Sequence, residues 1–521
     1  MTSGIHHITL ITANVQANVD FYVGFLGLRL VKRTGGYEDP RQLHLFYGDY
    51  AANPGSLLTF LVWQDGSPGR AGEGQVSEIG LAIDPASIGF WLERALRHQV
   101  KVEGTGQAFG ETELRLRDPD GVVIKLVGAN LPPLDAPKAS DIPPEHAIRR
   151  IRGATILSAT PEQTTAFISN HFGFRPAGRD GTTERLVSDI GDTVDIRDAT
   201  GFWRGAPGPG SADHIAFRAP DAEAVHAVER DLAKRNSSLT NLHDRNYFTS
   251  LYVREPGGVL IELATDGPGF TLDEPLETLG STLFVPPDAA AEAADIIALL
   301  PQFGLPGEER VVYRDLHYIH RLQTPEHPDG QTIVLLHGTG GNEADLMPLA
   351  RRVAPNAVLL GLRGRSTESG VQRWFRSPAP MQFDQADIRF ESGALEAFLE
   401  DARSAYQLDA DKMTALGYSN GANLMGAALL LHPGLIRRAV LLRPVQVLKD
   451  VPAADLSGTA ILIVLGQHDP YRGNGDDLAA TLKAAGATVT VKTLDAGHAL
   501  SDHDAPAIAE WLQAQAAAGP I

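Results

Sequence analysis

The segment RDPDGVVIKLVG at residues 117–128 recurs as REPGGVLIELAT at residues 254–265. Each copy joins a turn containing Pro and Gly to an apolar run, which is typical of a tight turn followed by a buried strand. Outward from both copies, strand-like and helix-like patterns follow one another in the order β-α-β-β-β. This order begins four times, at GIHHITLIT (4–12), SEIGLAI (77–83), RIRGATIL (150–157) and ADHIAFR (212–218). Because such repeats define a fold, we expect paired β-α-β-β-β modules of the α+β class.

The chain divides into several parts by composition. The first two modules predict a domain over residues 1–129, and the Pro-rich stretch 130–147 predicts a linker. The next two modules predict a second domain over residues 148–266, which would carry most of the site. A Pro-rich and acidic tail over 267–308 then precedes a third domain at 309–521. In that last domain strands alternate with longer helices, which favours a mostly parallel α/β sheet.

The composition limits the partners of the protein. The 521 residues carry a formal net charge of −19, which argues against nucleic acid or an anionic membrane as the main partner. No apolar run approaches the roughly 18 residues that span a bilayer. The first residues lack a signal-peptide pattern, so we expect a cytoplasmic protein. The chain has no cysteine, so a metal would have to be held by His, Asp or Glu.

Comparison of the repeats separates two sets of equivalent positions. Aligned without gaps, the modules place Lys125 against Glu262, Ile79 against His214, and Gly153 against His7. Two histidines and a carboxylate are the ligand set of non-haem Fe(II) oxygenases, whereas the duplicate set cannot bind a cation. We therefore expect one metal site, and a duplicate position that is filled by side chains and holds no metal.

Residues 4–265 resemble the vicinal oxygen chelate superfamily, and within it the ring-cleaving dioxygenases that act on hydroquinones and related phenols. The resemblance rests on HHITL, DHIAF, DRNYFTSLYVREPGG and IELATD. It implies a cup around one metal, Fe(II) with Mn(II) as the alternative, and O₂ as co-substrate. The residues that it implies are the ligands His7, His214 and Glu262, the polar active-site residues Arg245 and Tyr252, and the neighbouring residues His6 and Thr9. Where relatives often have a further histidine, this chain has Asp213.

The C-terminal part carries a second catalytic pattern. MTALGYSNGANLMGAALLL reads as a strand, a sharp turn and a helix, with Ser419 at the centre of G-x-S-x-G. Asp469 and His498 end the next predicted strands, so the order Ser, Asp, His fits an α/β-hydrolase triad. Backbone N–H groups of Asn420 and of Thr339, in HGTGG, would form the oxyanion hole.

Residues 309–518 resemble small carboxylesterase/phospholipase-like hydrolases, in particular those that accompany hydroquinone dioxygenases. In GVQRWFRS (370–377), the resemblance suggests that Trp374 or Phe375 lines an apolar acyl pocket, with core packing as the alternative for one of the two.

These patterns predict a bifunctional enzyme. We expect a ring-cleaving dioxygenase for a small aromatic substrate, fused to a serine hydrolase for an ester or acyl substrate that processes the cleavage product. Two alternatives stay open for the N-terminal part: a glyoxalase-type metal isomerase or lyase, which usually has four protein ligands, and a non-catalytic binding or sequestering module. The sequence leaves open whether the chain forms a homo-oligomer.

Overall fold

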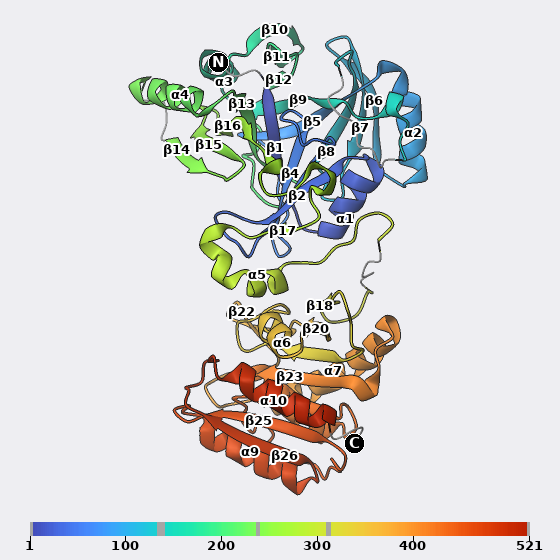
Figure 1. Cartoon of the computed structure of the whole chain (residues 1–521), viewed down its shortest axis with the longest axis vertical. Coiled ribbons are helices and arrows are strands. Elements are labelled where there is room, and N and C mark those ends of the chain that lie inside the picture. The colour runs from blue at the N-terminus through green and yellow to red at the C-terminus, as the bar shows by residue number, and fades with distance from the viewer. Residues whose placement is uncertain (1–3, 133–140, 236–239, 309–313, 518–521) are drawn as a thin grey trace. The chain divides into compact units, whose positions relative to one another are not determined.

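A computed structural model describes residues 4–132, 141–235, 240–308 and 314–517. Part of the expected linker, residues 133–140, therefore lies outside the described residues. The chain forms two compact units (Figure 1). The first unit comprises residues 1–291 and 303–310, and the second comprises residues 292–302 and 311–521.

The first unit contains four β-α-β-β-β modules. Module one contains β1 (Ile5–Thr12), α1 (Val15–Val19), β2 (Arg29–Gly35), β3 (Leu43–Gly48) and β4 (Leu57–Val62). Module two contains β5 (Gln75–Ile83), α2 (Ile88–Arg97), β6 (Val102–Ala108), β7 (Glu111–Arg117) and β8 (Val123–Gly128). Module three contains β9 (Arg150–Ser158), α3 (Pro161–Phe172), β10 (Arg175–Asp180), β11 (Thr183–Val187) and β12 (Thr193–Asp198). Module four contains β13 (Ala212–Ala219), α4 (Ala222–Arg235), β14 (Thr240–Asp244), β15 (Phe248–Arg254) and β16 (Leu260–Pro268).

The modules do not pair in chain order. Modules one and four share a nine-stranded sheet in the order β14-β15-β16-β13-β1-β4-β3-β2-β17. Modules two and three share an eight-stranded sheet in the order β10-β11-β12-β9-β5-β8-β7-β6. In each sheet the first strands of the two modules pair antiparallel at the centre, β1 with β13 and β5 with β9. Figure 1 shows β1 beside β13 and β4 in the middle of this unit.

The first module shows how local sequence produces its element. The helical segment after β1 forms as α1 followed by a wider π-helical turn, Asp20–Phe25. Asn14 caps the start by accepting a hydrogen bond from the backbone N–H of Ala17. Four large apolar residues on one side of this segment are buried with at most 1% exposure: Val19, Tyr22, Phe25 and Leu26.

The tail after β16 is held to the first unit by a buried cation. Lys32 Nζ, on β2, lies 2.8 Å from Asp273 and 2.6 Å from Glu274. The short strand β17 (Leu283–Phe284) then pairs with β2. Burying a lysine is tolerated only when its charge is paired, so these carboxylates fix the path of the tail. The helix α5 (Ala293–Leu299) belongs instead to the second unit.

The second unit is an α/β sheet in the order β18-β20-β19-β23-β24-β25-β26, parallel except for β18. Its strands are β18 (His320–Gln323), β19 (Thr332–Leu336), β20 (Val358–Leu362), β23 (Met413–Tyr418), β24 (Arg438–Leu442), β25 (Ala460–Gly466) and β26 (Thr488–Leu494), beside a separate hairpin of β21 (Ser366–Glu368) and β22 (Val371–Arg373). One face is covered by α7 (Gln385–Tyr406), α8 (Asn420–Leu431) and α9 (Arg472–Ala484), and the other by α6 (Met347–Val353) and α10 (Asp504–Ala517).

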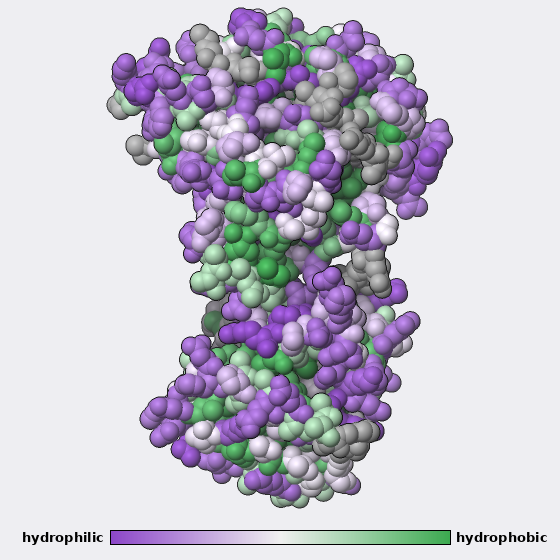
Figure 2. Space-filling view, in the orientation of Figure 1, coloured by the Kyte–Doolittle hydropathy of each residue, from purple (hydrophilic) through white to green (hydrophobic). Residues whose placement is uncertain are grey.

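Hydrophilic residues cover most of the face seen in Figure 2, in both units. Among the described residues, no helix is both long and apolar enough to cross a membrane.

Candidate functional site

The three predicted metal ligands lie on neighbouring strands of the nine-stranded sheet. His7 is on β1, His214 on β13 and Glu262 on β16, and the sheet brings them together from modules one and four. The register places Ala216 between them, opposite His7 on one side and Glu262 on the other. All three side chains are buried, with 3%, 7% and 0% exposure respectively. Burying this many ionisable groups is costly unless they share a counter-charge or a metal ion.

The geometry of the three donor atoms fits a metal ion. His7 Nε2 lies 3.2 Å from His214 Nε2 and 3.2 Å from Glu262 Oε2, and the third side, from His214 Nε2 to Glu262 Oε2, is 2.8 Å. Three ligands at about 2.1 Å from one metal and at right angles would be about 3.0 Å apart. Glu262 Oε2 is buried and has no hydrogen bond of good geometry to the protein. This donor set therefore fits one divalent ion, with one face occupied by protein and the other positions open.

The outer nitrogen of each histidine has a partner that orients the ring. His214 Nδ1 lies 2.7 Å from Asp213 Oδ2, and His7 Nδ1 lies 2.8 Å from His6 Nδ1. Such contacts fix which nitrogen faces the metal and raise the basicity of the ligand. Thr9 Oγ1, expected at the site, lies 2.9 Å from His214 Nε2 and 2.8 Å from Thr59 Oγ1. His6, Thr9 and Asp213 thus all lie beside the donor triangle.

Ser250 is a site residue that sequence reasoning missed. Its hydroxyl donates a hydrogen bond of 2.5 Å to Glu262 Oε1, which leaves Oε2 to face the histidines. Ser250 and Tyr252 are two residues apart on β15, so they face the same side of the sheet. Tyr252 is directly opposite Glu262 in the register. Because side chains along a strand alternate between its two faces, the choice of Tyr252 could also have pointed to Ser250, two residues earlier.

The charges of the triad are strongly coupled. Burial lowers the pKa of His214, but the hydrogen bond to Asp213 and the close carboxylate of Glu262 outweigh this and raise it to about 9. Burial is also the largest cause at His7, and there it prevails, so the pKa of His7 is lowered. At Glu262 burial raises the pKa, but the two histidines outweigh it and hold the pKa well below the ordinary value. A divalent ion that binds through His214 Nε2 must displace the proton that this raised pKa favours.

The triad lies in the wall of a cavity of about 800 Å³, within the range of small-molecule sites. Arg245 and Tyr252, both predicted site residues, line the same cavity. The Arg245 guanidinium lies 5.5 Å from the Tyr252 ring centre and 3.1 Å from Glu38. Burial, and then the nearby Glu262 carboxylate, raise the pKa of Tyr252 well above its ordinary value. Tyr252 is therefore a neutral donor at physiological pH, and Arg245 supplies positive charge to the cavity.

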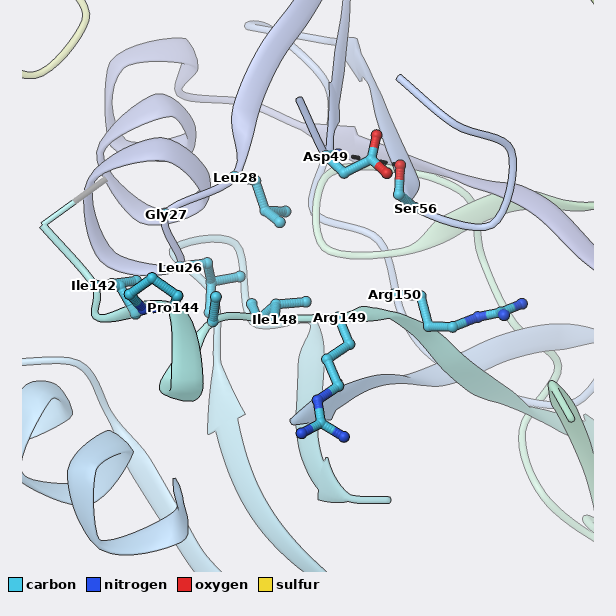
Figure 3. Close-up of a pocket in the computed structure, with 11 residues that line it drawn as sticks. Leu26, Gly27, Leu28, Asp49, Ser56, Ile142, Pro144, Ile148, Arg149 and Arg150 are labelled. Atoms are coloured by element: carbon cyan, nitrogen blue, oxygen red, sulfur yellow. Dashed lines mark hydrogen bonds between the residues drawn. The ribbon is translucent and has the colours of Figure 1, made fainter. Parts of the chain in front are cut away.

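A second, much smaller cavity lies elsewhere in the first unit (Figure 3). It is lined by Leu26 and Leu28 on one side and by Arg149 and Arg150 on the other, and its volume is about 30 Å³. That volume holds about one or two water molecules. It is too small for an aromatic substrate.

The duplicate position in the eight-stranded sheet corrects one part of the repeat alignment. There Gly80 stands opposite both Gly153 and Lys125, as Ala216 stands opposite both His7 and Glu262. The counterpart of His214, opposite Thr9, is therefore Glu78, opposite Thr155. The expected equivalent Ile79 is one residue away, and a shift of one residue in a strand changes the face.

Side chains fill this duplicate position with paired charges. Lys125 Nζ lies 3.4 Å from Glu78 and 3.2 Å from Glu113. Arg115, in the register position of Tyr252, donates hydrogen bonds of 2.6 and 3.1 Å to Glu78. A Cβ on Gly153 would lie 2.5 Å from the carbonyl oxygen of Thr193, so no ligand side chain fits there. The Lys125 ammonium thus lies where the other sheet has the carboxylate of Glu262.

In the second unit, Ser419 lies at a strained turn between β23 and α8. Its φ of +48° is rare for a residue other than glycine, and such strain is characteristic of a nucleophile elbow. The glycine that follows by two residues is required for packing, because a Cβ on Gly421 would lie 2.2 Å from the Leu336 carbonyl oxygen. The turn therefore presents the Ser419 hydroxyl beyond the carboxyl end of β23.

The three predicted triad residues form a hydrogen-bonded chain. Ser419 Oγ lies 2.9 Å from His498 Nε2, and His498 Nδ1 lies 2.8 Å from Asp469 Oδ2. Asp469 follows β25 and His498 follows β26, so all three groups come from the carboxyl ends of parallel strands. This arrangement allows the histidine to take the serine proton while the buried aspartate holds the ring.

The two residues of the predicted oxyanion hole lie beyond the ends of neighbouring strands. Thr339 follows β19, Asn420 begins α8 just after β23, and β19 pairs with β23.

Trp374 differs from the expectation that it lines a substrate pocket. It is completely buried, and its indole N–H donates a hydrogen bond of 2.8 Å to the His337 carbonyl. Its backbone N–H donates to Asn420 Oδ1 at 2.8 Å. Trp374 thus supports, from the core, the loop that follows β19, and Phe375 is also completely buried.

Comparison with known proteins covers both units. Residues 4–126 match the model of the Glyoxalase/Bleomycin resistance protein/Dioxygenase superfamily. MhqO of Bacillus subtilis, named as a ring-cleaving dioxygenase, is 38% identical over 55% of this chain and 91% of its own. The chlorohydroquinone/hydroquinone 1,2-dioxygenase of Sphingobium indicum is 34% identical over 54% of this chain and 91% of its own. MhqD of B. subtilis, named as a hydrolase, is 34% identical over 35% of this chain and 92% of its own.

Proposed function

Since the chain belongs to the ring-cleaving dioxygenases in its N-terminal part and to the MhqD-like hydrolases in its C-terminal part, we propose that it is a bifunctional enzyme of aromatic catabolism. The N-terminal part cleaves the ring of a hydroquinone or catechol-type phenol with Fe(II) and O₂. The C-terminal part is a serine esterase that hydrolyses an acyl bond in the cleavage product.

The observation that carries the dioxygenase proposal is the donor triangle of His7, His214 and Glu262 in the wall of a cavity of substrate size. A set of two histidines and one carboxylate leaves several positions open, as oxygen-dependent iron enzymes require. When bound, Fe(II) supplies the redox chemistry by which a phenolate and O₂ react. The name of the S. indicum relative supports hydroquinones as the substrate class.

The cavity residues have separate tasks in this proposal. Arg245 stabilises the negative charge that develops on the substrate oxygen, and Tyr252 donates a hydrogen bond to the same region. Asp213 accepts the hydrogen bond of His214 Nδ1 and holds that ring in place. Burial raises the pKa of Asp213, but the hydrogen bond from His214 outweighs it, and the net shift is downward. Asp213 therefore stays an anion, in contrast to the histidine that relatives often have there.

The hydrolase proposal rests on the triad of Ser419, His498 and Asp469, whose two hydrogen bonds are 2.9 and 2.8 Å. His498 takes the proton of Ser419 as the hydroxyl attacks the acyl carbon, and the amides of Thr339 and Asn420 stabilise the resulting oxyanion. The fusion of the two parts supports action in sequence on one substrate.

A glyoxalase-type isomerase or lyase is the second candidate for the N-terminal part. Such enzymes usually hold their metal with four protein ligands, whereas three ionisable side chains converge in the described part of this chain. The count of three favours the dioxygenase.

The test is oxygen uptake by Fe(II)-loaded protein supplied with hydroquinone, methylhydroquinone and catechol. We expect uptake with at least one of them and about one iron per chain. His214→Ala should lose the iron, whereas His243→Ala, in the same cavity wall but outside the triangle, should keep it. If none of the three phenols supports oxygen consumption, the dioxygenase proposal is rejected and the isomerase or lyase is favoured for the N-terminal part. Iron that survives His214→Ala would reject the metal site.

A further inference from the structure

The loop that carries His498 is held by two side chains that the triad does not include. Tyr418 Oη donates a hydrogen bond of 3.1 Å to the carbonyl oxygen of His498 itself. Arg443 Nε donates one of 3.0 Å to the Gly497 carbonyl, and Nη2 donates a longer one of 3.4 Å to the Ala499 carbonyl. Three consecutive carbonyls, centred on the catalytic histidine, are therefore bound by two residues.

Arg443 is itself fixed from behind. Its guanidinium makes a two-pronged ion pair with Asp504, at 2.8 and 2.9 Å, and both side chains are completely buried. Asp504 Oδ2 also accepts hydrogen bonds of 2.7 Å from the Ser501 amide and 3.0 Å from the Ser501 hydroxyl. The planar guanidinium suits such fixed multiple contacts better than an ammonium would. The pair thus ties both sides of the histidine loop to the start of α10.

Both residues also adjoin the nucleophile. Tyr418 directly precedes Ser419, and the Ser419 amide donates a hydrogen bond of 2.8 Å to the carbonyl of Leu442, the residue before Arg443. Arg443 adopts a φ of +51°, which side-chain-bearing residues rarely take, and its own amide donates to the Val464 carbonyl at 2.9 Å. Strain of this kind persists only where the surroundings hold it. The serine and the histidine loop are therefore built on the same two strand ends.

We propose that Tyr418 and Arg443 are positioning residues of the hydrolase, which hold the His498 backbone at the distance from Ser419 that proton transfer requires. This proposal rests on the proposed hydrolase activity. A misplacement of about 1 Å in a catalytic group can cost about a hundredfold in rate. Neither residue contacts substrate in this proposal, so the loss should fall on kcat and leave KM nearly unchanged.

The experiment measures hydrolysis of a p-nitrophenyl ester by full-length protein across a range of pH, together with the rate at which a fluorophosphonate labels Ser419. Tyr418→Phe removes one hydroxyl, and Arg443→Lys keeps the charge but loses the fork. We expect kcat to fall about fivefold in the first and about thirtyfold in the second, with KM within twofold and the labelling rate falling in parallel. The double variant should lose less than the product of the two effects, because both act on one loop.

Matched controls come from the same unit. Arg438→Lys lies at the other end of β24, where its guanidinium donates to the Asp411 carbonyl, and Tyr406→Phe removes a hydroxyl that contacts His320. Both should retain wild-type kcat and pH profile. A Tyr418→Phe variant with unchanged kcat, or with a loss confined to KM, would overturn the proposal. Should Arg443→Lys fail to fold, Tyr418→Phe still decides. No ester turnover and no labelling in wild type would instead reject the hydrolase activity itself.

Discussion

Lys125 occupies, in the eight-stranded sheet, the register position that Glu262 occupies in the nine-stranded sheet. Lys125 stands opposite Gly80 and Arg115, and Glu262 stands opposite Ala216 and Tyr252. A positive side chain thus replaces the acidic side chain at the equivalent place, and its charge is balanced by Glu78 and Glu113. One sheet thus brings two histidines and a carboxylate together, and the other balances two carboxylates with a cation of its own.

Replacing Lys125 by Met should destabilise the first unit without affecting its metal. Loss of the ammonium leaves the buried Glu113 without this partner, whereas the half-buried Glu78 keeps its hydrogen bonds from Arg115, and breaking a buried pair costs about 3 kcal/mol. Urea unfolding should show this loss, and metal analysis should show wild-type content. The variant that also carries Glu113→Gln should recover part of the stability. A drop in bound metal with Lys125→Met would contradict the separation of the two sheets.

Ser250→Ala should weaken metal binding while leaving the three ligands in place. Without the hydroxyl, Glu262 Oε1 loses its 2.5 Å hydrogen bond and the carboxylate can rotate away from the histidines. Removal of such an orienting partner typically costs about 10- to 100-fold in metal affinity. Competition with a chelator measures the affinity, and Ser77→Ala, whose hydroxyl bonds to the Thr155 carbonyl in the other sheet, is the control. Equal affinities in the two variants would remove Ser250 from the site.

The two activities should be separable by single substitutions. Glu262→Gln should abolish most oxygen uptake and leave ester hydrolysis intact, whereas Ser419→Ala should do the reverse, because no residue is shared between the triangle and the triad. Loss of a triad member typically costs several orders of magnitude in rate. If the hydrolase acts on the ring-cleavage product, Ser419→Ala should also make that product accumulate, visible as a persistent absorbance. If both activities are present in the wild type but the ring-cleavage product does not accumulate in Ser419→Ala, only the sequential pathway is rejected, and the two catalytic sites are not.

Asp118, in the turn before β8, should make the first unit less stable as the pH rises. Burial, only partly offset by hydrogen bonds such as that from the Val122 amide, raises the pKa of Asp118 to about 7, against an ordinary value of 3.8. The folded state binds the Asp118 proton more tightly than the unfolded state does. The contribution of this group to the free energy of unfolding is therefore greatest below about pH 4, and it decreases as the pH rises to about 7. Asp118→Asn should reduce the fall in unfolding free energy between pH 5 and pH 8 by about 2 kcal/mol. Identical pH profiles in urea unfolding would refute this.

The sequence was sufficient for features that repeat or that follow a fixed order. The module order, the parallel sheet of the second unit and the family resemblances are all confirmed. His7 and Glu262 could be chosen because a second copy has Gly153 and Lys125 at the same positions, whereas the equivalent assigned to His214 was wrong by one residue. The roles of these residues remain predictions.

Other features depend on details that no linear pattern carries. Ile79 was paired with His214 because the gapless alignment was displaced by one residue along β5, so that Ile79 took the place of Glu78. The strand offers little help with this choice, because an irregularity between Val76 and Glu78 interrupts its alternation. Its counterpart in the other sheet is the shift between Thr9 and Leu10. Arg443 was missed for a different reason, since its partners Asp504 and Gly497 are more than 50 residues away and belong to no motif.

The pairing of module one with module four affects how the protein is made. β1 begins at Ile5, and its antiparallel neighbour β13 begins at Ala212, so β1 leaves the ribosome about 200 residues before its partner. At typical rates of about 5–20 residues per second, the edge of β1 waits on the order of 10–40 s for its partner. Modules two and three can pair with each other during this time. The sheet with the triangle is therefore the last of the first unit to close during synthesis, and until then its unpaired edge is open to aggregation or to protection by chaperones.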